Sequence, residues 1–153
     1  MILTDHTLSN SSDATEVLAG KLAENLNAGD VVLLEGDLAA GKTTFVRGLL
    51  RGLRGNPEVV SSPSFVLIHS YDCGFGSIGR LHHIDLYRLD NRVADLREVG
   101  LSEVLSDAEA VVAVEWPKDT LATWIPTDSR VWRVGITIEK DDARSIEIRP
   151  PEG

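Results

Sequence analysis

A glycine-bounded segment that ends in lysine and threonine is the part of the sequence best suited to chemistry. Gly36, Gly41, Lys42 and Thr43 fit the pattern G-x-x-x-x-G-K-[ST], in which the backbone amides of a loop hold the phosphates of a nucleotide. Glycine permits the backbone angles that such a loop needs, and the positive end of the following helix attracts anions. The segment predicts a phosphate loop, with a glycine-rich surface turn as the alternative interpretation.

The side chains at the end of this loop have separate expected roles. Lys42 is expected to reach the β- and γ-phosphates and so to act in catalysis, and the Thr43 hydroxyl to bind Mg²⁺. Thr44 would then touch the α-phosphate. The sequence has no Asn-Lys-x-Asp stretch that would read guanine. ATP is therefore the expected nucleotide.

A phosphate loop also requires an acidic side chain near the γ-phosphate to hold the Mg²⁺. Glu115 ends the apolar run AVVAVE, and Asp85 lies in the segment LHHIDLYR. Because ligands gather at the carboxyl ends of parallel strands, one acid is expected to ligate Mg²⁺ and the other to orient water. The alternatives are an exposed acid at a strand end for Glu115, and a helix cap or a partner of Arg88 for Asp85.

Two histidines, a tryptophan and a serine-rich segment are further candidates for the site. His82 and His83 are adjacent, so on a strand they would face opposite sides and are not expected to share a metal. Trp116 is expected either to pack near the nucleotide or to serve in packing elsewhere. Residues 61–65, SSPSF, form a candidate switch loop near the γ-phosphate or a simple turn before a strand.

The elements that must position these residues follow from hydrophobic periodicity. A buried strand over 31–35 is expected before the loop and a helix over 43–53 after it, because an apolar run leads into apolar residues at helical spacing. A second buried strand is expected over 110–115. A helix over 12–26 would begin with a capping box of Asp13 and Glu16.

The remaining elements complete an α/β pattern. Strands over 65–71 and 80–87 would form a hairpin across the turn 72–79, and strands over 131–138 and 144–148 a terminal hairpin. Two further helices are expected, over 92–105 and 119–125. The order predicts an α/β fold, a three-layer P-loop NTPase-like domain with a mixed β-sheet and a terminal β-hairpin.

Bulk properties restrict the class of protein. The 153 residues suit one domain over 1–153. A net charge of −9, from 15 basic and 24 acidic side chains, argues against a protein that grips nucleic acid by itself. The single cysteine, the absence of a signal peptide and the absence of an apolar run of about 20 residues predict a cytoplasmic protein with no membrane segment.

Four segments in this order, GDLAAGKTTFVRGL, SSPSF, HIDLYRL and VEWP, resemble the TsaE (YjeE) family of bacterial P-loop ATPases over about residues 10–140. The resemblance implies slow hydrolysis of ATP with Mg²⁺ in support of threonylcarbamoyladenosine formation beside the anticodon of tRNA. The carbamoyl transfer itself would belong to TsaD, which acts in a TsaB–TsaD pair. The protein would then meet tRNA only indirectly, through these partners.

The resemblance also implies roles for individual residues. Thr43 and Glu115 would ligate Mg²⁺, and Asp85 would lie near the metal or the attacking water. Ser61 would contact the nucleotide from the switch-like segment, and Trp116 would lie beside it. The positions expected to hold the triphosphate are Gly36, Asp37, Leu38, Ala39, Ala40, Gly41, Lys42, Thr43 and Thr44.

The sequence departs from the family pattern in two places. Ala39 replaces the middle glycine of the loop, and a positive φ at that alanine would cost about 1 kcal/mol or more. The segment LHHIDLYR carries two histidines where one is usual, and no function is assigned to the second.

Two other function classes use the same loop. A small-molecule or nucleoside kinase would add an acceptor pocket and usually an arginine-bearing lid. Arg47, Arg51 and Arg54 instead lie on the helix after the loop. A non-catalytic module, in which ATP only sets affinity for a partner, would not need the acids that accompany Thr43.

Overall fold

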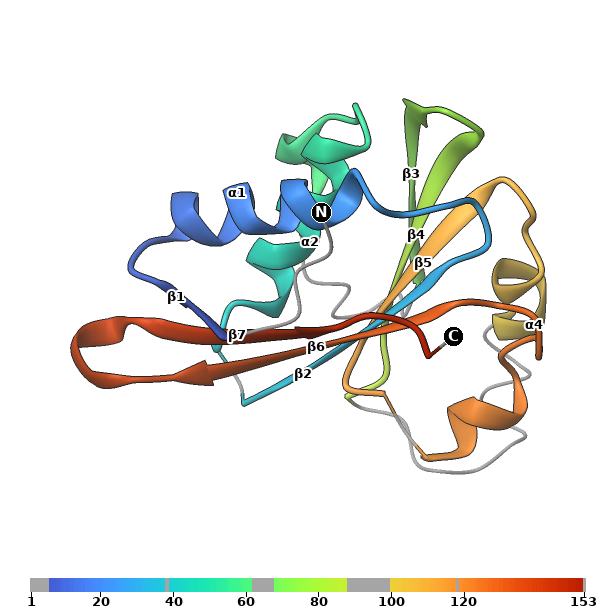
Figure 1. Cartoon of the computed structure of the whole chain (residues 1–153). Coiled ribbons are helices and arrows are strands. Elements are labelled where there is room, and N and C mark those ends of the chain that lie inside the picture. Colours follow the sequence, from blue (N-terminus) through green and yellow to red (C-terminus); the bar gives the residue numbers. More distant parts are fainter. Residues whose placement is uncertain (1–5, 38, 62–67, 88–99, 118, 153) are drawn as a thin grey trace.

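The computed structural model describes residues 6–37, 39–61, 68–87, 100–117 and 119–152 (Figure 1). Its strands are β1 His6–Ser9, β2 Val31–Gly36, β3 Ile68–Phe75, β4 Ile78–Asp85, β5 Ala110–Glu115, β6 Val131–Ile138 and β7 Arg144–Arg149. Its helices are α1 Ser12–Ala23, α2 Lys42–Gly52 and α4 Leu101–Leu105, with 3-10 turns η1 Pro57–Val59, η2 Asp119–Thr123 and η3 Lys140–Asp142. Among these helices, none is long and apolar enough to cross a membrane.

The strands of the described chain form one mixed sheet in the order β1-β7-β6-β2-β5-β4-β3. The four central strands β6, β2, β5 and β4 are parallel to one another. The outer pairs, β1 with β7, β7 with β6, and β3 with β4, are antiparallel. The terminal hairpin therefore extends the sheet through β6 instead of standing apart from it, and the predicted mixed α/β sheet is confirmed.

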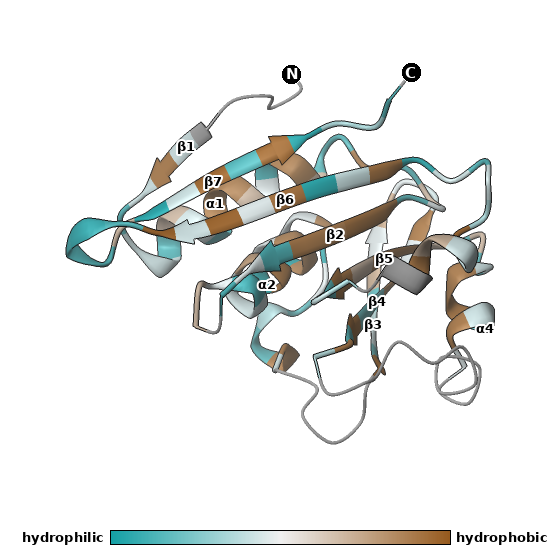
Figure 2. Ribbon diagram, turned by 90° about the horizontal axis from the view of Figure 1, so that it is seen from below, coloured by the Kyte–Doolittle hydropathy of each residue, from teal (hydrophilic) through white to brown (hydrophobic). Residues whose placement is uncertain are grey.

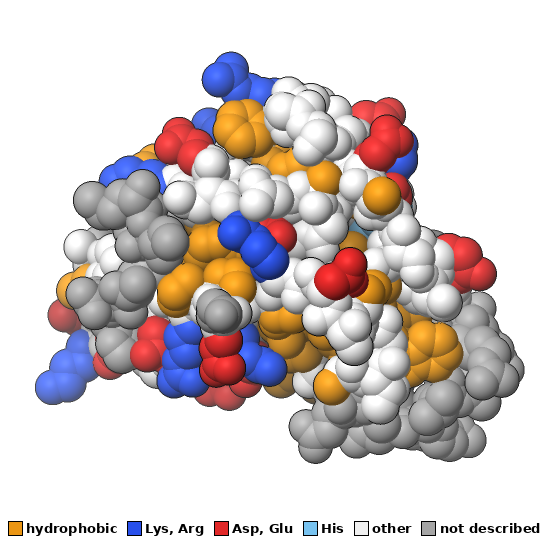
Figure 3. Space-filling model, turned by 45° about the vertical axis from the view of Figure 1, so that its right-hand side comes forward, with side chains coloured by type: hydrophobic (Ala, Val, Ile, Leu, Met, Phe, Trp, Pro, Cys, Tyr) orange, Lys and Arg blue, Asp and Glu red, His pale blue; other side chains and the backbone are white. Residues whose placement is uncertain are grey.

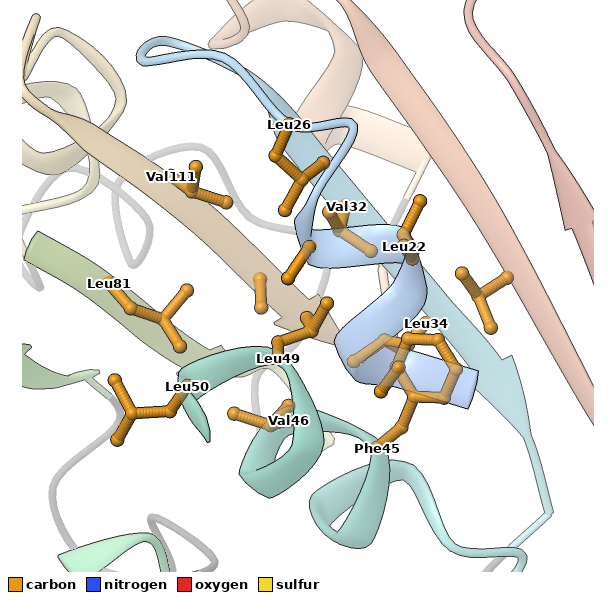
Figure 4. Packing of buried hydrophobic residues seen from close by; sticks show 14 of the residues in the cluster. Leu22, Leu26, Val32, Leu34, Phe45, Val46, Leu49, Leu50, Leu81 and Val111 are labelled. Atoms are coloured by element: carbon orange, nitrogen blue, oxygen red, sulfur yellow. The ribbon is translucent and has the colours of Figure 1, made fainter. Parts of the chain in front are cut away.

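Two hydrophobic layers cover the two faces of this sheet, as the three-layer prediction requires. Val32 and Leu34 of β2 face the layer that contains α1 and α2, whereas Val31 and Leu33 face the layer that contains α4 and η2. Figure 2 shows β2 as hydrophobic along most of its length, which is the pattern of a strand that is buried on both faces. The first layer is the larger of the two and is the one drawn in Figure 4.

Helices α1 and α2 pack closely against each other above the sheet (Figure 4). The contact is close because α2 carries Gly48, where an added Cβ would lie only 2.5 Å from the main-chain oxygen of Glu16. Phe45, Val46 and Leu49 of α2 are fully buried in the same layer. This packing fixes the first turn of α2, and with it the end of the candidate phosphate loop.

Several predicted boundaries differ from the structure. Helix α1 begins after Ser11, whose side chain accepts a hydrogen bond from the Ala14 amide at 3.0 Å, so the predicted capping box of Asp13 and Glu16 is wrong. The β3–β4 hairpin is longer than predicted, because its strands extend to Phe75 and from Ile78 and leave a two-residue turn. The predicted helix over 119–125 is the shorter 3-10 turn η2.

Strand β1 is the one strand of the described chain that the sequence patterns did not predict. Its four residues, HTLS, pair antiparallel with β7 at the edge of the sheet. The segment is short and lacks a clear apolar alternation, so its pairing depends on the exposed edge of β7. Predictions for residues 65–67 and 92–99 lie outside the described residues.

Candidate nucleotide-binding site

The candidate site lies where three parallel strands end at the same edge of the sheet. The loop leaves β2 at Gly36 and enters α2 at Lys42. Glu115 ends β5 and pairs in register with Leu34 of β2, while Asp85 ends β4 and pairs in register with Glu115. The sheet thus brings together the loop and both predicted acids, which are far apart in the sequence.

The backbone of the loop is shaped by two glycines and one strained alanine. An added Cβ on Gly36 would lie 2.5 Å from the carbonyl oxygen of Ile136 in β6, so only glycine fits where the loop leaves the sheet. Gly41 has a φ of 110° at the N-terminus of α2. Ala39 has a φ of 64°. This is the positive φ that would strain an alanine at that position, at a cost of about 1 kcal/mol or more.

The Lys42 side chain folds back over the loop and is almost fully buried. Its ammonium donates hydrogen bonds to the carbonyl oxygens of Gly36 at 2.7 Å and Asp37 at 2.8 Å, and it lies 4.0 Å from the centre of the Trp116 ring. Burial lowers the pKa of Lys42, an effect that the nearby carboxylates of Glu115, Asp85 and Asp37 oppose. A buried cation in this position favours an anionic ligand.

Thr43 and Glu115 meet directly at the edge of the sheet. The Thr43 hydroxyl donates a hydrogen bond to Oε2 of Glu115 at 3.0 Å, and Glu115 is buried. Mg²⁺ prefers oxygen ligands and usually takes one or two from protein, leaving the rest to phosphates and water. No group of three or more potential metal-ligating side chains gathers within the described residues. The Thr43 hydroxyl and the Glu115 carboxylate are oxygen groups of the kind that could hold Mg²⁺ beside a nucleotide.

Glu115 is oriented from behind by a chain of hydrogen-bonding side chains. His83, which is fully buried, contacts Oε2 of Glu115 through Nε2. Its Nδ1 lies 3.2 Å from the Tyr71 hydroxyl, and that hydroxyl lies 3.3 Å from Nδ1 of His69. Side chains of this kind fix the orientation of a metal ligand without touching the metal.

The two adjacent histidines do point to different partners, as their places on a strand predict. His82 contacts Ser70 at 2.7 Å and Asp107 at 2.8 Å, away from Glu115. The sequence alone indicated no functional role for His83. Its spacing of two residues from Asp85 was the available signal, because residues two apart on a strand share a face.

Asp85 and Trp116 lie next to the loop. Within the described residues, their side chains make no hydrogen bond to it. Oδ1 of Asp85 accepts a hydrogen bond from the Tyr87 amide at 2.9 Å. Burial raises the pKa of Asp85, and the neighbouring Glu115 carboxylate adds to this effect. Trp116 has a φ of 57°, and the centre of its ring lies 4.8 Å from that of Tyr87, with the two rings tilted by 51°.

The remaining predicted site residues are less closely involved. Thr44 is half-buried in the first turn of α2, next to Thr43. Ser61 is exposed. Burial raises the pKa of Tyr71, and a hydrogen bond with the main chain of Ser61 partly opposes this effect. Ser61 therefore lies next to Tyr71, which belongs to the row of hydrogen-bonded side chains behind Glu115. Leu38 and residues 62–65 of the predicted switch segment lie outside the described residues.

Comparisons with known proteins agree with the predicted family. The model of a family described as threonylcarbamoyl adenosine biosynthesis protein TsaE matches residues 9–146. A tRNA threonylcarbamoyladenosine biosynthesis protein TsaE from Bacillus subtilis (strain 168) is 40% identical over 136 residues, which cover 88% of this chain and 78% of that protein. The protein of the same name from Nostoc sp. is 46% identical over 133 residues, which cover 84% and 75% of the two chains.

A solved structure also resembles the whole chain. The crystal structure of YdiB from Bacillus subtilis matches with a TM-score of 0.69 and 28% sequence identity, over 99% of this chain and 88% of that one. The predicted α/β fold is confirmed by this match as well as by the sheet.

Proposed function

Because the chain belongs to the TsaE family of threonylcarbamoyl adenosine biosynthesis proteins, we propose that it binds ATP with Mg²⁺ and hydrolyses the ATP slowly. The hydrolysis would support the formation of threonylcarbamoyladenosine in tRNA. The observation that carries the proposal is the direct contact between the Thr43 hydroxyl and the Glu115 carboxylate, next to the buried Lys42 ammonium. These groups come from different parts of the chain. The hydroxyl and the carboxylate suit Mg²⁺, and the ammonium suits the phosphates of the nucleotide.

The loop binds the phosphates through its main chain and through Lys42. The ammonium has three donors, of which two are used by the carbonyl oxygens of Gly36 and Asp37. The third can bind a phosphate oxygen while the other two keep the side chain in place. The N-terminal end of α2 adds the partial positive charge of its free amides.

The acids at the ends of β4 and β5 complete the site. Mg²⁺, when bound, would neutralise charge on the phosphates. Glu115 holds an orientation set by Thr43 and His83, which suits a metal ligand. Asp85 is the acid that we assign to the attacking water, because it ends β4 in register with Glu115, which is already assigned to the metal.

The charge of the chain favours an indirect encounter with tRNA. Its net charge is −9, and on the face in Figure 3 the coloured acidic and basic side chains are interspersed, without one broad basic surface. Tight binding of tRNA requires clustered cations. We therefore assign the contact with tRNA to partner proteins, TsaD together with TsaB. Family membership favours this role over the kinase that shares the same loop.

The test is a measurement of phosphate release from ATP by the purified chain, with Mg²⁺ or EDTA, alone and with TsaB and TsaD of the same organism. We expect turnover that needs Mg²⁺ and rises when the partners are present. Glu115→Gln should reduce Mg²⁺-supported turnover at least about tenfold, since changes even around metal ligands commonly cost that much. Glu24→Gln, at an exposed residue after α1, serves as the matched control.

Three outcomes would contradict the proposal. Normal Mg²⁺-supported turnover by Glu115→Gln would remove that residue from the metal site. Turnover that is unchanged by TsaB and TsaD would argue against the partner role. Transfer of the labelled γ-phosphate to a small acceptor would favour the kinase.

A further inference from the structure

An arginine from the far end of the chain holds the outer side of the phosphate loop. Arg144, the first residue of β7, donates hydrogen bonds from Nε to the carbonyl oxygen of Ala40 at 2.9 Å and from Nη2 to that of Ala39 at 3.3 Å. Nη1 donates to the carbonyl oxygen of Asp142 at 2.6 Å, in the hairpin between β6 and β7. The guanidinium therefore connects this hairpin to the loop.

These contacts determine which way two peptide groups of the loop point. A trans peptide is planar, so its carbonyl and its amide point in opposite directions. The carbonyl oxygen of Ala39 shares a peptide group with the amide of Ala40, and that of Ala40 shares one with the amide of Gly41. Because Arg144 holds both oxygens, it directs both amides away from itself. The Ala40 amide donates to the carbonyl oxygen of Asp37 inside the loop, at 3.1 Å.

The held peptides lie where the loop is strained. Ala39 has a φ of 64° and Gly41 a φ of 110°, so the residues on both sides of Ala40 are in the left-handed region. An alanine leaves this region readily unless its surroundings hold it there. The planar fork of an arginine suits this task, since it can donate to two oxygens at once.

We propose that Arg144 is a positioning residue of the phosphate loop, which keeps the Gly41 amide turned toward the phosphates of the nucleotide. The inference rests on the proposed binding of ATP by this loop. All hydrogen bonds of Arg144 to described residues end on main-chain carbonyl oxygens. Through these contacts the guanidinium acts on the shape of the backbone.

The test is the affinity for fluorescent N-methylanthraniloyl-ADP in EDTA, a condition that leaves the metal site out of the measurement. Arg144→Met should weaken binding about tenfold, because it removes charge-assisted hydrogen bonds from two loop peptides. Arg144→Lys, which keeps the charge but replaces the fork by one ammonium, should weaken it less. Arg149→Met is the matched control, because Arg149 lies on the same strand and pairs with Glu147 on the surface.

Backbone amide NMR supplies a reading that general stability would not change. We expect the Gly41 amide resonance of Arg144→Met, recorded well below its melting temperature, to shift little on addition of ADP, whereas that of Arg149→Met should shift as in the wild type. Arg144→Met that binds like the wild type would overturn the inference. If that variant fails to fold, Arg144→Lys decides: weakened binding supports the inference, and wild-type binding overturns it.

The two proposals fail in different ways. A wild-type chain that binds no nucleotide overturns both the proposed function and the role of Arg144. A wild type that binds, together with an unaffected Arg144 variant, overturns only the positioning role.

Discussion

The two ends of the parallel strands surround their acidic side chains with different partners. At the end where β2 and β5 begin, Asp30 and Asp107 are surrounded by donors that belong to the protein itself. At the end where the same strands finish, Glu115 and Asp85 lie beside a buried lysine and a strained loop. The same sheet thus has one end that is satisfied by its own contacts and one end that is suited to a ligand.

Asp30 shows how complete the contacts are at the first end. Its carboxylate accepts hydrogen bonds from Arg130 Nε at 3.0 Å and Nη2 at 2.9 Å, from the Trp132 indole at 3.1 Å and from the Asn27 amide at 2.9 Å. These contacts connect the start of β2 to the start of β6. A buried carboxylate with this many donors stabilises the fold and needs no ligand.

At the second end, the charged side chains have fewer partners among the described residues. Both hydrogen bonds that the Glu115 side chain makes to described residues use one oxygen, Oε2. Burial lowers the pKa of Lys42 and raises that of Asp85, so both groups are held where their charged forms are disfavoured. Ala39 and Trp116 add two non-glycine residues with positive φ. Strain and perturbed pKa values in one place are typical of functional sites.

The largest expected effect comes from Lys42→Met, which keeps the length of the side chain and removes its charge. We expect ATP turnover to fall about 100-fold or more, since a positioned cation on the phosphates is lost. The free energy of unfolding should change by less than about 1 kcal/mol, or about 4 °C in melting temperature. The reason is that the loss of the two hydrogen bonds of Lys42 is offset by removing the cost of a buried cation. Phosphate release and thermal unfolding would check the two parts.

Lys21→Met is the matched control for this prediction, because Lys21 is exposed on α1. It should change neither turnover nor melting temperature. A Lys42→Met chain that unfolds, or that hydrolyses ATP as the wild type does, would remove the distinction between the two ends of the sheet.

Much of this second end was predictable from the sequence because its chemistry depends on short local patterns. Gly36, Lys42 and Thr43 belong to one motif, and Glu115 follows directly from the apolar run that forms β5. The parallel sheet then brings these segments to one edge. From the sequence, a positive φ at Ala39 was only a condition under which strain would arise, and the structure meets that condition with a φ of 64°.

The contacts that support the site were not predictable, because they depend on pairing between distant strands. Arg144 reaches the loop only because β7 joins the sheet beside β6, and no local pattern marks that arginine. Tyr71 meets His83 through the register of the β3–β4 hairpin. The cluster around Asp30 combines Arg130 and Trp132 from about 100 positions later in the chain.

Asp30→Ala should have the largest effect at the first end. The change leaves the buried Trp132 indole without its acceptor and releases Arg130, so we expect a loss of about 3 kcal/mol in the free energy of unfolding. Nucleotide affinity should stay within about twofold of the wild type, because Asp30 lies at the opposite end of β2. Urea unfolding and a nucleotide titration of the folded protein would measure the two effects.

Asp128→Ala provides the comparison for that variant, since Asp128 is exposed near the same end of the sheet. It should leave stability nearly unchanged. If Asp30→Ala weakened nucleotide binding as strongly as Lys42→Met, the two ends would not be separate in function.

The smallest expected effect concerns the pH dependence of stability, through Asp107. Hydrogen bonds from Arg80 hold the pKa of Asp107 well below its usual range, and those from His82 and the Glu109 amide add to this effect. A carboxyl with a lowered pKa in the folded state stabilises the fold fully above its unfolded pKa of about 3.9. That contribution is lost as the pH falls below this value. The free energy of unfolding should therefore decline in acid.

Asp107→Asn separates this contribution from that of the other acids. The variant should be less stable than the wild type at neutral pH, and its unfolding free energy should fall less steeply between about pH 4 and pH 2. The effect of Asp85 on the pH dependence of stability has the opposite sign. Its raised pKa lowers stability at neutral pH, and this cost disappears as the pH falls toward about 4. Urea unfolding at several pH values, with Asp128→Asn as the control, would measure the slopes. Equal slopes for the wild type and Asp107→Asn would show that this end of the sheet does not hold its acid in the charged form.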